Sequence, residues 1–298
     1  MITLQIIITI ILIVSSFTAT NLIDKFIVSK KAKNNYAYTV VSVSVFFAES
    51  IILSLFITWK GITIQDLTIP FITGLMSGFF YIAYFYTLKH EEASQIIPLM
   101  NLQPVGLTLI HVFIIGTIFT RYQLFGIIVA VLGVIILESH KTVLSFFKSK
   151  ATLLGMGYGL LVAIPMAMNE SASNSMPFLN MQMPFATGAL ITASILLIKK
   201  DVRATIKEHY KLLPYTIISE MTTITGNISI WYGFTLIASP ILMGIDTIQP
   251  LVLFGITTLL SKYYPHIIKE DNTRKTLIRK FMGTILVVIG CAVLVYTL

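Results

Sequence analysis

Apolar residues occur in ten long runs along the chain, and polar residues are concentrated in the gaps between those runs. The runs span 4–24, 37–58, 67–88, 93–119, 122–138, 151–168, 177–198, 211–235, 238–260 and 279–297. A helix rises about 1.5 Å per residue, so runs of this length suit a hydrocarbon core of about 30 Å. Runs this uniformly apolar are not the alternating strands of a membrane barrel. The pattern predicts an all-α integral membrane protein with ten transmembrane helices.

Composition indicates that the lipid bilayer is the main solvent of the chain. Apolar residues make up 56% of the sequence and charged residues 11%, whereas a soluble domain has about 25% charged residues. The ten runs use most of the 298 residues and leave no room for a soluble catalytic domain. The chain has no Gly-rich phosphate loop, no Cys or His cluster with metal-ligand spacing and no recognisable nucleophile with an adjacent base. We therefore expect no enzyme activity, no metal and no cofactor.

The positive charges predict the orientation of the chain in the membrane. Of the 21 Lys and Arg residues, 19 lie in or directly beside the gaps that follow odd-numbered runs, and the other gaps contain only Lys60 and Arg121. Because basic residues mark cytoplasmic loops, we expect cytoplasmic odd-numbered loops and both termini outside, in a plasma or inner membrane. We expect the basic clusters, Lys280 included, to face anionic lipid headgroups and not nucleic acid.

Short motifs recur in the two halves of the chain. The segment 101–104 (NLQP) is matched by 247–250 (TIQP), and the segment 86–88 (YTL) by 234–236 (FTL). Gly126 and Gly133 are matched by Gly283 and Gly290, with the same separation of about two helical turns. Each glycine pair predicts a notch where a neighbouring helix approaches closely.

The order of these matches indicates a duplication with repeats at 1–145 and 146–298. Five is an odd number of spans, so the second five-helix repeat must be inverted in the membrane relative to the first. Inverted repeats are typical of secondary transporters, whose substrate site lies near the bilayer midplane.

These features resemble the EamA-type transporters of the drug/metabolite transporter superfamily. The resemblance is carried by the five-plus-five arrangement, by closing helices of the form 122–126 (YQLFG) followed by 133–137 (GVIIL), and by prolines in the fourth and ninth spans at Pro98, Pro104, Pro240 and Pro250. It covers essentially the whole chain. It implies a basket of ten helices that moves small organic solutes by alternating access. It also implies a cavity lined mainly by helices one, three, four, six, eight and nine, and termini in the cytoplasm, opposite to the orientation that the charges predict.

Three carboxylates lie inside predicted spans and are the first candidates for chemistry. They are Glu49 in span two, Glu220 in span eight and Asp246 in span nine. An acidic group in a membrane is costly unless it meets water, a partner or a ligand. Desolvation favours the protonated form of a carboxylate, so such a group can exchange protons or bind a cationic solute. The structural alternative for each is a hydrogen bond to a neighbouring helix or a place in a water-filled vestibule.

Amides accompany these acids at helical spacing. Asp246 and Gln249 are three residues apart, and we expect them on one face of a single helix. Glu220 and Asn227 lie on one stripe of span eight. In span four, Asn101 and Gln103 are the corresponding candidates, although amides also join helices to one another.

Aromatic rings complete the predicted site. Tyr81 in span three and Trp231 in span eight are expected to form the wall of a cavity that suits an organic cation or an aromatic metabolite. Trp231 equally fits the aromatic belt at the membrane interface. We interpret Asp24 and the adjacent Lys25 as a solvated pair at a helix end.

The sequence as a whole predicts a secondary transporter that exports a small metabolite or drug-like compound, with an amino acid or organic cation favoured and protons as the coupling ion. The alternatives are an uncoupled importer or exchanger, and a lipid flippase or assembly partner without solute transport. An anionic substrate is disfavoured because we expect no Lys or Arg within the spans. The partners expected are the bilayer, the solute and protons, and the sequence leaves monomer and homodimer open.

Overall fold

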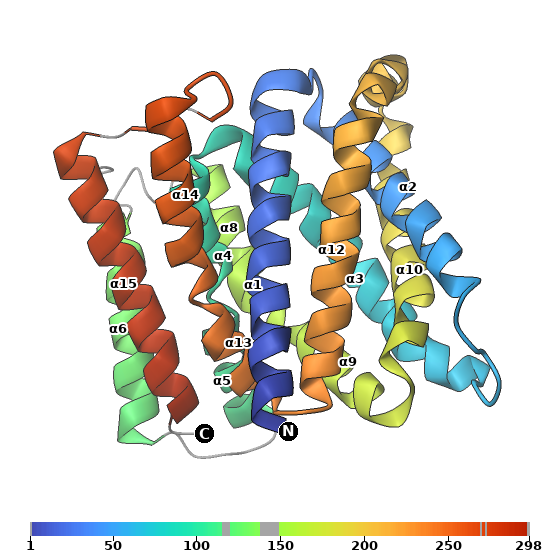
Figure 1. Cartoon of the computed structure of the whole chain (residues 1–298), viewed down its shortest axis with the longest axis horizontal. Coiled ribbons are helices and arrows are strands. Elements are labelled where there is room, and N and C mark those ends of the chain that lie inside the picture. The colour runs from blue at the N-terminus through green and yellow to red at the C-terminus, as the bar shows by residue number, and fades with distance from the viewer. Residues whose placement is uncertain (1, 115–119, 138–148, 269, 272, 297–298) are drawn as a thin grey trace. The chain divides into compact units, whose positions relative to one another are not determined.

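The computed structural model describes residues 2–114, 120–137, 149–268, 270–271 and 273–296 (Figure 1). Within these ranges the regular structure is entirely helical, which confirms the predicted all-helical class. The helices are α1 (Ile2–Phe26), α2 (Asn35–Ser54), α3 (Ile64–His90), α4 (Ala93–Met100), α5 (Gln103–Phe113), α6 (Arg121–Leu137), α8 (Lys150–Leu161), α9 (Ala163–Ser175), α10 (Gln182–Ser194), α11 (Lys200–Thr205), α12 (Leu213–Phe234), α13 (Ser239–Asp246), α14 (Gln249–Tyr263) and α15 (Arg274–Tyr296).

Several helices begin where the sequence supplies a cap. The Asn34 side chain accepts hydrogen bonds from the backbone N–H groups of Tyr36 and Ala37 at 3.0 and 3.3 Å, which satisfies two free donors at the start of α2. The Ser149 hydroxyl accepts one from the backbone of Thr152 at 3.3 Å and caps α8 in the same way. These short polar side chains separate one apolar run from the next.

Seven segments are long and apolar enough to cross a membrane. They are Leu4–Lys31, Asn35–Ser54, Ile64–His90, Lys150–Ser175, Phe178–Ile198, Ser239–Tyr263 and Arg274–Val293. They correspond to seven of the ten predicted spans, so the chain is a multi-pass membrane protein.

The other three predicted spans are each shorter or more polar. The fourth is divided between α4 and α5, and part of it lies outside the described residues. The fifth corresponds to α6, which has 17 residues. The eighth corresponds to α12, which has 22 residues but contains Glu220 and Asn227. The count of ten spans therefore stays a prediction.

The chain divides into two compact units. Unit 1 comprises Met1–Lys89 and Pro165–Ala238, and unit 2 comprises His90–Ile164 and Ser239–Leu298. Each unit thus combines a segment of the N-terminal half with a segment of the C-terminal half. The boundary predicted between residues 145 and 146 lies outside the described residues, and the two repeats stay a prediction.

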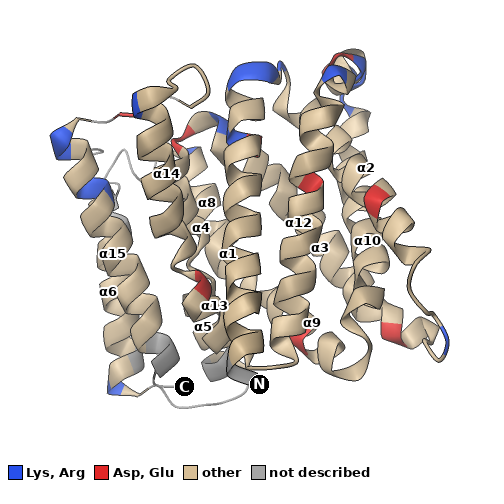
Figure 2. Cartoon of the chain, in the orientation of Figure 1, with Lys and Arg blue, Asp and Glu red and all other residues tan. Residues whose placement is uncertain are grey.

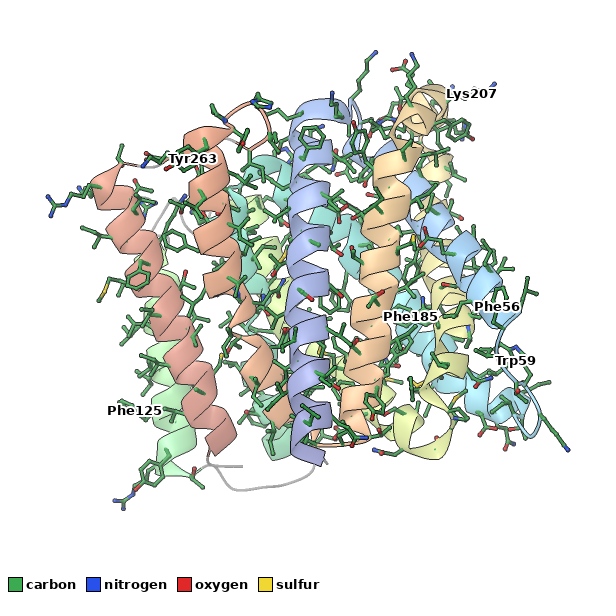
Figure 3. The ribbon with its side chains drawn as sticks, viewed as in Figure 1. Phe56, Trp59, Phe125, Phe185, Lys207 and Tyr263 are labelled. Carbon is green, nitrogen blue, oxygen red and sulfur yellow. The ribbon has the colours of Figure 1, made fainter. Side chains whose placement is uncertain are left out.

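In unit 1, α1 packs beside α12, and α2 packs against α10 and α12 (Figure 1). A Cβ added at Gly74 of α3 would collide with the backbone of Phe185 in α10, so the absence of a side chain there permits close contact. The core contains many aromatic rings. The ring centroids of Phe46 and Phe185 are 6.1 Å apart and those of Phe185 and Trp231 are 5.4 Å apart, and both pairs are edge-to-face. Figure 3 labels Phe185 among these helices.

In unit 2, α6 and α15 run side by side and meet at the paired glycines (Figure 1). A Cβ added at Gly133 would lie 2.7 Å from the carbonyl oxygen of Gly283, and one added at Gly290 would lie 2.6 Å from that of Gly126. Both distances are shorter than real Cβ contacts. The prediction that these glycines allow a neighbouring helix to approach closely is confirmed.

The surfaces of the helices agree with a lipid environment. Phe125 of α6 is 57% exposed and points away from its own unit, and Phe56 at the end of α2 is 82% exposed (Figure 3). Figure 2 shows that the Lys and Arg residues gather at the ends of the helices, while the middle of each helix is largely uncharged. Exposed apolar side chains between charged helix ends are what a bilayer stabilises.

Candidate functional site

Two helices of unit 2 are interrupted at the recurring motif. The first break lies between α4, which ends at Met100, and α5, which begins at Gln103; the second lies between α13, which ends at Asp246, and α14, which begins at Gln249. In both cases the new helix begins with Gln-Pro, a place where the missing N–H group of proline costs no helical hydrogen bond. The motif match in the sequence is thus also a match in local backbone structure.

The break in the second helix corrects one expectation. Asp246 and Gln249 do not belong to a single regular helix, because the backbone N–H groups of Thr247 and Ile248 bond three residues back, to Gly244 and Ile245, at 3.4 and 3.1 Å. Asp246 is the last residue of one helix and Gln249 the first residue of the next. Interrupted backbone at membrane depth is tolerated where protein or a water-filled cavity surrounds it.

The two breaks meet. α4 packs against α14, and α5 packs against α13. The Asn101 amide nitrogen donates to the Gln249 side-chain oxygen at 3.4 Å and to the Ile97 carbonyl at 3.1 Å. This bond joins the first break directly to the second.

Two polar atoms at the break are buried and unsatisfied. Asp246 is 5% exposed and Gln249 is 3% exposed. Within the described ranges, Asp246 Oδ1 and Gln249 Nε2 have no hydrogen-bond partner. An unsatisfied buried polar group costs about 1–3 kcal/mol, so the break favours an occupant that offers one donor and one acceptor.

The helix dipoles at the break favour a particular charge arrangement. Asp246 lies at the C-terminus of α13, where backbone carbonyls already supply partial negative charge, and Gln249 lies at the N-terminus of α14, where N–H groups supply partial positive charge. A cationic group beside Asp246 and an acceptor beside Gln249 would compensate both ends. Among the described residues no group of three or more His, Cys, Asp or Glu side chains is arranged to hold a metal.

The nine predicted site residues divide between the two units. Asn101, Gln103, Asp246 and Gln249 belong to unit 2, where Asn101 and Gln249 are in direct contact and Gln103 is half-buried. The members in unit 1 are Glu49, Tyr81, Glu220, Asn227 and Trp231.

In unit 1 the stripe on α12 faces the protein interior. Glu220 and Trp231 are 1% and 3% exposed, and Asn227 is half-buried. Trp231 packs against Phe185, and Tyr81 of α3 packs against the rings of Phe46 and Phe85. Trp231 is therefore a core residue of unit 1.

Glu49 on α2 interacts electrostatically with Glu220. Its residue surface is partly exposed, yet both carboxylate oxygens are buried and have no hydrogen-bond partner among the described residues.

Asp24 is an acidic residue whose environment the sequence did not reveal. The interpretation of Asp24 as a solvated end residue is wrong, because it is 1% exposed and accepts hydrogen bonds from Ser219, Tyr84 and Tyr38 at 2.7, 3.1 and 3.3 Å. The adjacent basic side chain, Lys25, turns instead to the Leu88 carbonyl at 2.7 Å. The available signal was the polar spacing of Asn21 and Asp24 near the end of an apolar run.

Lys25 and Lys280 are basic side chains buried within membrane segments, which corrects the expectation that the spans contain no Lys or Arg. Lys25 is in the segment Leu4–Lys31 and is 7% exposed. Lys280 is in the segment Arg274–Val293 and is 1% exposed, so it does not face lipid headgroups.

Lys280 is instead the centre of an ionic network in unit 2. It forms ion pairs with Glu92, at the start of α4, and with Glu270, at 3.2 Å. Glu270 also accepts hydrogen bonds from the backbone and hydroxyl of Ser94. Ser261 of α14 and the backbone of Glu270 bond to one another at 2.9 and 3.1 Å, so the network joins α4, α14 and α15.

The comparison with protein families finds one match. Residues 4–139 match the family model described as "EamA-like transporter family". This match places the first half of the chain in the EamA-like transporter family. The resemblance found in the sequence is confirmed. EamA-like proteins are transporters, so the family match supports a membrane transporter of the drug/metabolite type.

The structural comparison finds a similar fold over the whole chain. A solved structure titled "Crystal structure of protein" has a TM-score of 0.59 and 14% sequence identity, over 99% of this chain and 98% of that one. At this identity the likeness concerns the fold. The comparison with curated proteins found no match.

Proposed function

We propose that this EamA-like protein is a secondary carrier of a small organic solute that works by alternating access. The observation that carries the proposal is the meeting of two broken helices at Asn101 and Gln249, with Asp246 Oδ1 and Gln249 Nε2 buried and unsatisfied beside it. Half-helix ends that surround polar side chains are the substrate sites of many secondary transporters. A cationic group on the solute would meet Asp246, and an amino acid or organic cation supplies one.

The proposed architecture is ten transmembrane helices in two inverted five-helix repeats, with residues 1–145 and 146–298 as the repeats. The reciprocal contacts of unit 2 support it. Gly126 corresponds to Gly283, and Gly133 corresponds to Gly290. The contact of Gly133 with Gly283 therefore has its equivalent in the contact of Gly290 with Gly126. The contacts of α4 with α14 and of α13 with α5 are exchanged in the same way. A two-fold axis in the membrane plane relates inverted repeats and produces this reciprocity.

The proposed direction of transport is export in exchange for protons, with Glu220 and Asp246 as the acidic residues that take part. A preference for a cationic solute is supported by the buried lysines. Lys25 and Lys280 are both bonded to acceptors within their own units, so neither is offered to an anionic solute. Asn227, Gln103 and Tyr81 remain proposed solute contacts.

Exchange of labelled solute across proteoliposomes tests the carrier. Purified protein is reconstituted and screened for counterflow of amino acids and organic cations. Asp246→Asn is expected to reduce the exchange of the transported solute by about tenfold or more, because a hydrogen bond to a charged group contributes about 1.5–3 kcal/mol. Gln249→Leu is expected to reduce it as well.

Asp201→Asn is the matched control, because Asp201 is an exposed aspartate of unit 1. Equal exchange in Asp246→Asn, Gln249→Leu and Asp201→Asn would reject the break as the solute site. Solute flux that is independent of protons would identify an uncoupled importer or exchanger. Absence of flux with any solute, in protein shown to be folded, would favour a lipid flippase or an assembly partner.

The proposed orientation makes a separate prediction. In a Cys291→Ser background, Lys60→Cys is expected to react with a membrane-impermeant maleimide on intact cells, and Lys207→Cys only after permeabilisation. Both lysines are exposed, and Figure 3 labels Lys207 at one end of unit 1 and Trp59, the neighbour of Lys60, toward the other. Cys291 is buried and is the only cysteine of the chain. The reverse labelling would place both termini in the cytoplasm.

A further inference from the structure

Asp24 on α1 and Glu220 on α12 are buried acidic residues on neighbouring helices of unit 1. Each is 1% exposed. Ser219 and Glu220 are consecutive on α12, and Ser219 donates to Asp24 at 2.7 Å. On α2, Tyr38 and Ser42 are one turn apart, and Tyr38 donates to Asp24 while Ser42 donates to Glu220. The two acids are therefore connected through α12, where Ser219 is next to Glu220, and through α2, where Tyr38 and Ser42 each donate to one of them.

The two acids differ in how their oxygens are satisfied. Both oxygens of Asp24 accept hydrogen bonds, from Ser219, Tyr38 and Tyr84. Glu220 Oε1 accepts a hydrogen bond from Ser42, and the Thr223 hydroxyl also acts on this carboxylate. Glu220 Oε2 is buried and has no hydrogen-bond partner in the described part of the chain. Hydrogen bonds donated to a carboxylate stabilise its charged form. Asp24 thus has hydrogen-bond donors at both oxygens, whereas Glu220 has one open oxygen.

No cationic side chain balances this pair among the described residues. Every hydrogen bond that Asp24 and Glu220 accept there comes from a hydroxyl group. The titratable groups that face Glu220 are acidic or phenolic, with Asp24 from α1 and Glu49 and Tyr38 from α2. Two adjacent buried carboxylates do not both remain charged without a cation.

The geometry selects a proton over a metal ion as that cation. Hydroxyl groups of Ser219, Tyr38, Tyr84 and Ser42 already contact three of the four carboxylate oxygens of the pair. A metal ion requires several open oxygens, and Glu220 Oε2 is the one carboxylate oxygen of the pair without a donor. One open oxygen is sufficient for one proton.

We propose that Asp24 and Glu220 form a proton-binding pair in which Asp24 stays ionised and Glu220 binds and releases one proton at Oε2. Release leaves the Glu220 carboxylate and one free proton, and uptake reverses the step. Asp24 is a positioning residue, since its charge determines the pH at which the proton of Glu220 leaves. The role of this pair as the coupling site of the carrier rests on the proposed function, with Asp246 serving the solute.

Infrared difference spectroscopy of the full-length protein in nanodiscs, titrated with acid and base in the absence of solute, tests the pair. The wild type is expected to show the carbonyl band of a buried protonated carboxylic acid, and Glu220→Gln is expected to lack it. Gln retains an acceptor for Ser42, which favours a folded variant. Asp24→Asn is expected to keep the band but lose it at a pH about one unit lower, because a neighbouring negative charge no longer disfavours ionisation.

Glu208→Gln is the matched control. Glu208 is exposed and forms an ion pair with Lys33 at 2.8 Å, and this pairing lowers the pKa of Glu208 below its usual value. The control is expected to titrate like the wild type. An unchanged band in Glu220→Gln, or the same midpoint in Asp24→Asn as in wild type, would overturn the proposal.

A second readout separates this inference from the proposed function. Once a solute is found, Glu220→Gln is expected to retain solute counterflow but lose solute-driven proton movement, followed with a pH dye inside proteoliposomes. Loss of both in folded Glu220→Gln protein would show that Glu220 serves the solute and not a separate proton site. A titrating band in protein that transports no solute would support the pair and reject the carrier.

Discussion

Lys280→Met is expected to lower the free energy of unfolding by about 3–5 kcal/mol, because it removes the only basic partner that the described structure gives to a buried acid. Lys280 and Glu270 each have a side chain that is 1% exposed, and Glu92 is the third member of the network. Without the ammonium group, only hydrogen bonds would remain to stabilise the buried Glu270 side chain. The expected result is a melting temperature about 10 °C lower in detergent.

The control for this variant is Lys275→Met, which changes an exposed lysine of the same helix. It is expected to melt within about 1–2 °C of the wild type, since exposed charges contribute little to stability. Glu270→Gln added to Lys280→Met is expected to restore part of the loss, because the unpaired buried charge is then removed. If Lys280→Met and Lys275→Met melt alike, the network does not hold α4 and α15 together.

Gly290→Ala is expected to destabilise unit 2 by about 3 kcal/mol, because the added methyl group has no space. It would lie 2.6 Å from the Gly126 carbonyl oxygen and 2.8 Å from the Cα of Ala130, and backbone atoms cannot move aside as a flexible side chain can. α6 and α15 must separate to admit it. The expected measurement is a lower melting temperature and a reduced yield of monodisperse protein.

Gly255→Ala is the matched control within the same unit. Gly255 lies in α14, and a Cβ placed there meets nothing within 4 Å. Alanine has a higher helix propensity than glycine by about 1 kcal/mol, so this variant is expected to be as stable as the wild type or more so. A wild-type melting temperature for Gly290→Ala would mean that the two helices are not in close contact in the membrane.

The recurring motif predicted part of the structure at the two helix breaks. The repeat of NLQP as TIQP indicated that two segments are equivalent, and their prolines indicated a disturbed backbone. It did not show that Asp246 and Gln249 belong to different helices, or that Asn101 reaches Gln249 at 3.4 Å. Contact between residues 148 positions apart depends on how helices pack and not on local spacing.

For Asp24 and Lys280 the prediction from the sequence was wrong. Both lie near the ends of apolar runs, where charged residues usually meet water or headgroups, and the sequence placed both at the surface. In the structure each is 1% exposed, because hydroxyl groups from α2, α3 and α12 surround Asp24 and two glutamates pair with Lys280. Partners distant in the sequence determine whether a terminal charge is solvated or buried.

The sequence by itself determined that the protein is helical and lies in a membrane, because apolar length and the positions of charges are local properties that a bilayer selects directly. It also determined the paired glycines of α6 and α15 as sites of close approach, since a missing side chain is visible in the sequence. Only the tertiary structure decided which polar groups are satisfied. Glu220 Oε2, Asp246 Oδ1 and Gln249 Nε2 became candidates for ligands because the helices packed around them supply no partner within the described residues.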